Sequence, residues 1–297
     1  MSYKIFCESL EDHVLKISLD KGSDLKLLAE IIVAEDINTY KKSYGKTLIV
    51  GGADGYLGAV LISGLAALRS GSRYVEVFST DTNHSLIPLH RPELMTSHDI
   101  KQLDHKFNTY KNLLLGPGMS SNDWSRETFS IFKNFCQNKN TDKNIVIDAG
   151  FLGLLAVDQF SYDKWVLTPH IGEAAQLLNT STKHIQDNRL DSAKEIQKIY
   201  GGIIILKGNN TIIQTQDNSY VCSHGNNSMG TAGMGDCLAG TLISLMSLVN
   251  AKDYNNAILY AVALHSMAAD NILAKKGKFG ILASDVIVEI NNLLNNN

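Results

Sequence analysis

A glycine-rich stretch at residues 225–240, reading GNNSMGTAGMGDCLAG, carries the clearest chemical signal in this sequence. Its glycines loosen the backbone just before Asp236, and the apolar residues that follow predict a buried helix. A glycine-rich turn at a helix N-terminus directs unpaired N–H groups and the positive end of the helix dipole at one point, which suits a phosphate. Asp236 would repel that phosphate, but it could take a proton from a hydroxyl beside it. The alternative is that Asp236 only caps the helix.

A lysine at the end of an apolar strand is the second candidate. Lys207 follows the run GIIIL, and the loop LKGNNT offers backbone N–H groups beside its ammonium group. One lysine and several N–H groups together can neutralise a polyphosphate. The alternative is a lysine whose charged end simply reaches water from the end of the strand.

Five other polar residues could belong to the same site or have only a structural role. His170 follows Thr-Pro and could bind a ligand or be an ordinary surface histidine. Glu173 could complement the dipole of the helix it begins, or act in catalysis or near a metal. Asp148, at a strand end, could bind magnesium-bound water or cap a turn. His265 lies in an apolar helix and is expected to be structural, and Arg69 is expected at a helix terminus.

The elements that would position these residues have the pattern of an α/β fold. Apolar runs that end in turn residues predict buried strands, and stretches with helical spacing alternate with them. We therefore expect a mostly parallel central sheet with helices on both faces. The strands are expected at 46–52, 73–79, 112–118, 144–150, 164–170 and 202–208, and the helices at 59–71, 171–178, 239–249, 255–276 and 284–294.

One hairpin departs from the parallel pattern. The segments TIIQT (211–215) and SYVCS (219–223) are separated by a short polar turn, which predicts an antiparallel pair. We expect this hairpin at an edge of the sheet.

The candidate motifs GGADGYLGA, GPGM, DAG, TPHIGE and LKGNNT each follow directly after a predicted strand. Ligands of open α/β sheets bind in the crevice at the carboxyl ends of the strands. The motifs should therefore face one crevice, and their convergence is stronger evidence than any single motif.

Composition narrows the class of protein. A formal charge of −3 without a basic block argues against nucleic acid as the main partner. The four cysteines form no CxxC pair, which is typical of a reduced compartment and gives no sign of a disulfide framework or a cysteine zinc site. We see neither a signal peptide nor an apolar stretch of about 18 residues, so we expect a cytoplasmic protein without a membrane partner. We interpret residues 1–40 as an N-terminal extension of unknown role and residues 41–297 as a single domain.

The order of the motifs resembles a known family. GGADGYLGAVLISGLAALRSG, LLLGPGM, VIDAG, VLTPHIGEAAQLL, LKGNNTII and GNNSMGTAGMGDCLAGTL, followed by AVALHSMAADNILAKKG and LASD, are similar to the ADP-dependent NAD(P)H-hydrate dehydratases of the ribokinase-like superfamily. The resemblance covers about residues 42 to 293. It implies a ribokinase-like fold and a nucleotide repair enzyme that returns the S-epimer of hydrated NADH or NADPH to NAD(P)H. The implied cosubstrate is ADP, converted to AMP and phosphate with Mg²⁺ as cofactor, and the implied assembly is a homo-oligomer, a tetramer in the family.

The resemblance also implies a set of site residues. The residues that would contact the hydrated dinucleotide are Ala59, Gly118, His170 and Asp236. The residues that would hold the adenine nucleotide are Lys207, Gly208, Asn209, Asn210, Thr211, Asn226, Gly230, Thr231, Gly233 and Gly235. Asp236 would be catalytic: it would deprotonate the ring hydroxyl, whose oxygen would attack the terminal phosphate and then leave as phosphate, a better leaving group than hydroxide.

Two other functions stay open. One is a kinase of the same superfamily that phosphorylates a hydroxymethylpyrimidine or a thiazole alcohol, because it needs the same glycine-rich turn and the same aspartate. The other is a catalytically silent nucleotide-binding protein, which departures from the family pattern allow. Ala232 and Met234 stand where the family has the first glycine and the threonine of GGTGD, and Gly150 replaces the second aspartate of DAD.

Overall fold

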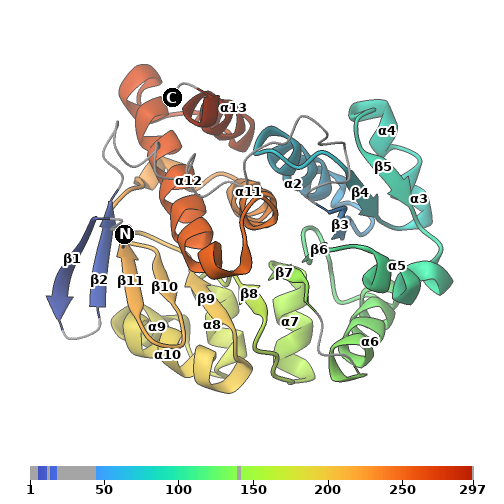
Figure 1. Cartoon of the computed structure of the whole chain (residues 1–297), viewed down its shortest axis with the longest axis horizontal. Coiled ribbons are helices and arrows are strands. Elements are labelled where there is room, and N and C mark those ends of the chain that lie inside the picture. The colour runs from blue at the N-terminus through green and yellow to red at the C-terminus, as the bar shows by residue number, and fades with distance from the viewer. Residues whose placement is uncertain (1–5, 12–13, 19–44, 139–141, 296–297) are drawn as a thin grey trace.

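A single sheet of eleven strands forms the centre of the protein (Figure 1). The computed structural model describes residues 6–11, 14–18, 45–138 and 142–295. The strand order is β1-β2-β11-β10-β9-β8-β7-β6-β3-β4-β5. In chain order the strands are β1 (Phe6–Glu11), β2 (Val14–Ser18), β3 (Thr47–Val50), β4 (Val75–Phe78), β5 (Met95–Ser97), β6 (Asn112–Leu115), β7 (Asn144–Ile147), β8 (Trp165–Leu167), β9 (Ile203–Leu206), β10 (Ile212–Gln214) and β11 (Ser219–Cys222).

Helices cover both faces of this sheet, as predicted (Figure 1). One layer contains α2 (Leu57–Arg69), α11 (Met234–Ser247), α12 (Tyr254–Lys276) and α13 (Ala283–Asn295). The other contains α5 (Leu103–Thr109), α6 (Asp123–Asn138), α7 (Gly150–Val157), α8 (Ile171–Leu177), α9 (Thr182–Asp187) and α10 (Arg189–Tyr200). Short α3 (Asp81–His84) and α4 (Ile87–His90) lie in the connection from β4 to β5, and the 3-10 turns are η1 (Ile100–Gln102), η2 (Asn227–Met229) and η3 (Ala251–Asp253).

The apolar strand sequences explain why both faces are covered. Successive side chains of a strand point to opposite faces, so a fully apolar strand needs a core on each side. In β3, Ile49 belongs to the core beneath α2, α11, α12 and α13, whereas Leu48 and Val50 belong to the core on the other face. The helix expected at 59–71 is α2, which ends at Arg69, so Arg69 lies at a helix terminus as expected.

The antiparallel hairpin is present, but its predicted position at the edge is wrong. Strands β9, β10 and β11 pair antiparallel, while the strands from β9 to β5 pair in parallel. Strand β11 also pairs in parallel with β2, and β1 lies beyond it. The hairpin is therefore interior, because two strands from the first 40 residues extend the sheet. Residues 1–5, 12–13 and 19–44 lie outside the described residues, and the division between the first 40 residues and the domain stays a prediction.

Helix α12 qualifies the expectation that no apolar stretch has membrane-spanning length. By length and composition alone Tyr254–Lys276 could cross a membrane, but 78% of its most apolar window is buried inside the fold. It packs against α11 and α13 on the sheet (Figure 1), which is the position of a core helix.

Candidate active site

The loops at the carboxyl ends of the parallel strands touch one another. After β3, Gly52 N donates to Pro117 O of the loop after β6 at 2.8 Å. A Cβ on Gly116 would lie 1.7 Å from Asp148 O of the loop after β7, so only glycine allows this approach. The predicted convergence of the motifs in one crevice is therefore confirmed for these three loops.

Lys207 connects the loop after β9 to the same crevice. Its Nζ lies 2.6 Å from Asp148 Oδ1 and 3.9 Å from Glu173 Oε2, and its side chain is only 18% exposed. The lysine therefore does not extend into water, and that alternative is wrong. Burial acts to lower the pKa of Lys207, but the attraction of Asp148 and Glu173 outweighs it and raises the pKa. An ammonium group is thus held charged at the floor of the crevice.

Asp148 is organised by a second contact. Its Oδ1 accepts from Thr168 Oγ1 at 2.6 Å as well as from Lys207, and its carboxyl group is almost fully buried. Asp148 is therefore more than a turn cap: it places the ammonium group of Lys207.

Asp236 is brought to this pair by the start of α11. The helix begins at Met234, and its N-cap is Gly233 in the left-handed conformation at φ 89°, so the alternative that Asp236 is the N-cap is wrong. A Cβ on Gly235 would lie 3.2 Å from Lys207 Nζ and 3.6 Å from Asp148 Oδ2. The first turn of α11 therefore lies directly over the ion pair, with Asp236 in that turn.

The electrostatics of the crevice favour a basic Asp236. Burial raises the pKa of Asp236 to about 7; repulsion by Asp148 and Glu173 adds to this effect, and only Lys207 opposes it. The pKa of Glu173 is also raised, chiefly by burial. A carboxylate with a pKa near neutral pH can accept a proton and release it again, which is what general base catalysis needs.

His170 and Glu173 form the capping box of α8. His170 Nδ1 accepts from the backbone N–H groups of Gly172 and Glu173 at 2.9 and 3.2 Å, and Glu173 Oε2 accepts from His170 N at 2.7 Å. Glu173 is therefore a helix-terminal charge, as one alternative held, and it also faces Lys207. Because Nδ1 accepts, a neutral ring carries its proton on Nε2, at a side chain that is 59% exposed.

Two substrate residues predicted from the resemblance lie together on the β3 side of the crevice. A Cβ on Gly118 would lie 3.0 Å from Ala59 Cβ and 2.7 Å from Tyr56 O. Gly118 has φ +64°, which favours glycine, and Tyr56 beside it is 55% exposed. Sequence reasoning missed this exposed ring.

A cavity of about 290 Å³ lies beside the Lys207 cluster. The predicted nucleotide residues that line it are Lys207, Gly208, Asn209, Thr211, Asn226, Gly230 and Gly235. Three others are not among its lining residues: Asn210 lies in a left-handed turn, Thr231 Oγ1 donates to Ile281 O at 2.8 Å, and Gly233 is the N-cap of α11. Their predicted ligand contacts stay predictions.

Sequence reasoning also missed residues that organise the cavity. Arg189 of α10 donates to Asn209 O and, at 3.3 Å, to Leu206 O, and so holds the loop after β9. Asp270 of α12 accepts from Gly225 N and Asn226 Nδ2 at 2.9 and 2.8 Å. Arg189 and Asp270 are both distant in sequence from the loops they bind, so no local sequence pattern predicts these contacts.

His265 belongs to the core, as expected, and also lines the cavity. Burial lowers the pKa of His265 to about 4, so the ring is neutral at physiological pH. Its Nε2 has no hydrogen-bond partner among the described residues.

Comparison with known proteins agrees with this geometry. The model of the NAD(P)H-hydrate dehydratase family matches residues 47–292. The chain belongs to this family. It is 34% identical over 264 residues to the bifunctional NAD(P)H-hydrate repair enzyme Nnr of Coxiella burnetii, covering 87% of this chain and 52% of that protein. It is 30% identical to the ADP-dependent (S)-NAD(P)H-hydrate dehydratase of Neisseria meningitidis, with 85% of each chain covered.

Solved structures support the same fold. The ADP/ATP-dependent NAD(P)H-hydrate dehydratase of Bacillus subtilis, co-crystallised with ATP and Mg²⁺, superposes with a TM-score of 0.78 at 25% identity, covering 91% of this chain and 95% of that one. A ribokinase-like superfamily protein from Enterococcus faecalis superposes with a TM-score of 0.83 at 24% identity, covering 97% and 98%. The ribokinase-like fold is therefore confirmed. The chain spans about half the length of the bifunctional relatives it matches.

The structure gives a physical reason for one departure from the NAD(P)H-hydrate dehydratase pattern. A Cβ on Gly150 would lie 2.2 Å from Met119 O, so an aspartate at this position would need the backbone to move. At the other departure, Met234 is buried in the core, whereas Ala232 is exposed. Met234 therefore contributes packing at the first turn of α11.

Proposed function

We propose that this protein dehydrates the S-epimer of hydrated NADH or NADPH to NAD(P)H, using ADP and releasing AMP and phosphate. The observation that carries the proposal is the place of Asp236, a carboxyl group with a pKa of about 7 in the first turn of α11, above the Lys207–Asp148 ion pair. The names of the family relatives support it, since the Neisseria meningitidis protein is named as ADP-dependent.

The residues around the cavity suit a nucleoside diphosphate. The base and ribose would occupy the 290 Å³ cavity, and the phosphates would meet Lys207 and the N–H groups at the start of α11. Arg189 would keep the Gly208–Asn209 backbone in place for this contact.

Asp236 would start the reaction by accepting the proton of the hydroxyl on C6 of the hydrated nicotinamide ring. The freed oxygen attacks the terminal phosphorus of ADP, and the bond to the bridging oxygen breaks to release AMP. The electron pair of the ring nitrogen then expels phosphate from C6, and loss of the neighbouring proton restores the double bond of NAD(P)H. Ala59, Gly118 and His170 would hold the dinucleotide on the other side of the crevice.

The donor set also suits Mg²⁺. Asp148, Glu173 and Asp236 face a single ammonium group, and their mutual repulsion helps to raise the pKa values of Glu173 and Asp236. This excess of oxygen-borne negative charge matches the ligands that Mg²⁺ prefers, one or two carboxylates together with phosphate oxygens. When bound, Mg²⁺ would neutralise charge on the transferred phosphoryl group.

A small-molecule kinase remains the second candidate, because it needs the same base and the same phosphate site. A hydroxyethylthiazole kinase from Pyrococcus horikoshii superposes with a TM-score of 0.54 at 13% identity, which is a likeness of fold alone. The family match over residues 47–292 favours the dehydratase.

The deciding experiment follows the return of reduced-nicotinamide absorbance from hydrated NADH, with ADP and with ATP as separate cosubstrates. ADP should support turnover, and AMP should form in equal amount to NADH. A stable phosphorylated product without NADH would support the kinase, and ADP binding without any turnover would support a silent nucleotide-binding protein.

We also propose that the chain is a cytoplasmic homo-oligomer, as the family resemblance implies, with a tetramer as the expected size. Exposed apolar side chains such as Val157 and Leu89, which are 88% and 78% exposed, could be covered by such an assembly. Light scattering of the purified full chain would give the mass, and a monomer at working concentration would contradict this proposal.

A further inference from the structure

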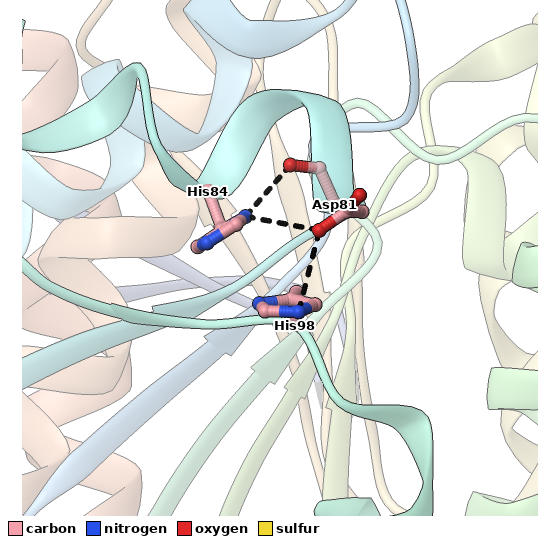
Figure 2. A group of neighbouring side chains, drawn as sticks. All are labelled: Asp81, His84 and His98. Atoms are coloured by element: carbon pink, nitrogen blue, oxygen red, sulfur yellow. Dashed lines mark hydrogen bonds and ion pairs between the residues drawn. The ribbon is translucent and has the colours of Figure 1, made fainter.

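Two histidines and an aspartate meet at the far side of the crevice, away from the cluster around Lys207. Asp81 and His84 are the first and last residues of α3, which follows β4, and His98 directly follows the edge strand β5. Figure 2 shows both imidazole rings with a nitrogen directed at the Asp81 carboxyl group. Two segments that are separate in sequence thus present three metal-ligand side chains to one point.

The distances between the ligand atoms fit a transition-metal ion. His98 Nε2 lies 3.3 Å and His84 Nδ1 lies 3.8 Å from Asp81 Oδ1, and the three ligand atoms are all within 4.8 Å of one another. Zinc bonds of about 2.0–2.2 Å to nitrogen and oxygen place neighbouring ligands of a tetrahedral shell roughly 3.3–3.6 Å apart. The Asp81–His98 pair already has this spacing, and the Asp81–His84 pair is slightly wider. The two imidazole nitrogens lie within 4.8 Å of each other, so side-chain rotation would have to complete the shell.

The side chains are also accessible. Asp81 is 87% exposed and His98 is 42% exposed, so an ion can enter from solvent and keep water as a further ligand. The two imidazole rings lie 3.9 Å apart between centroids, so the two histidine side chains are already next to each other without a bound ion.

We propose that Asp81, His84 and His98 form a binding site for a transition-metal dication of the Zn²⁺ type. Two imidazole nitrogens with one carboxylate select Zn²⁺, Ni²⁺ or Cu²⁺ over Mg²⁺ and Ca²⁺, which prefer all-oxygen shells. The cysteine pattern of the sequence showed no sign of a zinc site built from cysteines, and the proposed site contains no cysteine. It is also separate from the carboxylates that suit Mg²⁺ beside Lys207, which follow other strands.

The bound ion would tie the edge of the sheet to the substrate side of the crevice. Asn83 of α3 donates from Nδ2 to Gly52 O and Ala53 O at 2.9 and 3.1 Å, and Thr80 Oγ1 donates to Asp54 Oδ1 at 2.8 Å. These bonds hold the loop after β3, which leads into the helix that carries Ala59. A cross-link from His98 to α3 would therefore steady that loop.

The present contacts offer a simpler reading, in which the histidines only hydrogen-bond to Asp81. His84 Nδ1 lies 2.7 Å from Asp81 O, as a ring that donates to a helix carbonyl would. A metal would exchange this bond for coordination, so direct binding measurements distinguish the two readings.

The test is calorimetric titration of the chelator-treated full chain with Zn²⁺ in a large excess of Mg²⁺, which occupies all-oxygen sites. We expect one Zn²⁺ per chain in the wild type, and a melting temperature that rises with Zn²⁺. His98→Gln and Asp81→Asn should weaken binding at least about tenfold, the loss seen even when only an outer-shell partner is removed. His105→Gln, the same exchange at an exposed histidine of α5, should bind like the wild type.

Several outcomes would overturn the site. These are no Zn²⁺ binding by the wild type, equal binding by His98→Gln and His105→Gln, or displacement of the bound Zn²⁺ by Mg²⁺. The readout does not depend on turnover, so failure of the dehydratase proposal leaves it unaffected. In the absence of Zn²⁺, His98→Gln should keep the wild-type rate with ADP and Mg²⁺, because the wild type then has no metal cross-link to lose.

Discussion

The substitution Asp236→Asn tests whether Asp236 is a catalytic base or has only a structural role in α11. Asparagine keeps the size and the polar oxygen of the side chain, but it cannot accept the hydroxyl proton. A general base contributes about 10²–10⁴-fold to the rate, or about 2.7–5.4 kcal/mol of activation free energy. We therefore expect the dehydration rate to fall by at least about two orders of magnitude.

The fold should survive this change, for reasons that the structure gives. The N-cap of α11 is Gly233, so the substitution removes no cap. It also takes one carboxylate from a cluster in which Asp148 and Glu173 repel Asp236 and only Lys207 attracts it. Thermal stability should be unchanged or higher, and ADP should bind as well as or slightly better than before, because a negative charge beside the phosphates is gone.

The assay measures turnover of hydrated NADH with ADP about one pH unit above the pKa of about 7, where some nine-tenths of Asp236 is ionised. Asp191→Asn is the matched control, because Asp191 is also the third residue of its helix, α10, and is exposed. That variant should turn over normally. Near-normal turnover by Asp236→Asn, with an unchanged melting temperature, would refute the role of Asp236 as the base.

Three further predictions follow from the same contacts. Lys207→Ala should weaken ADP binding by about 1–3 kcal/mol in calorimetry, while Lys194→Ala on the exposed face of α10 should not; equal affinities would remove Lys207 from the phosphate site. Gly150→Ala should lower the free energy of unfolding by about 1–3 kcal/mol in urea, because its Cβ would lie 2.2 Å from Met119 O. Gly153→Ala in the same helix should cost nothing, since its Cβ meets only Gln176 Oε1 at 3.7 Å, and equal effects would contradict this reasoning. The pKa of Asp236 is raised on folding from 3.8 to about 7, so its ionised form costs stability that is fully recovered below the lower value. The advantage of Asp236→Asn in thermal melts should therefore grow between about pH 4 and pH 7 and then level off; a constant difference would mean that the pKa is not raised.

The amino-acid sequence determined the elements and the order in which they meet the crevice. Local composition determined which segments form strands and which form helices. The run IIIL before Lys207, for example, is short, apolar and rich in β-branched residues, which favours a buried strand. The motifs followed the strands, and parallel pairing then placed them at one edge whatever the details of packing. Lys207, Asp236 and the glycines of the cavity could be predicted for this reason.

Tertiary structure alone decided which contacts each side chain makes. That Asp236 is not the helix cap depended on where α11 begins, and its raised pKa depended on burial and on the charges of Asp148 and Glu173, which follow other strands. The place of the β10–β11 hairpin depended on a partner strand from the first 40 residues. Arg189 and His98 carry no local signal, because their partners lie across loops that only the folded chain brings into contact. Burial and charge proximity are properties of three-dimensional distance, and a linear pattern does not contain them.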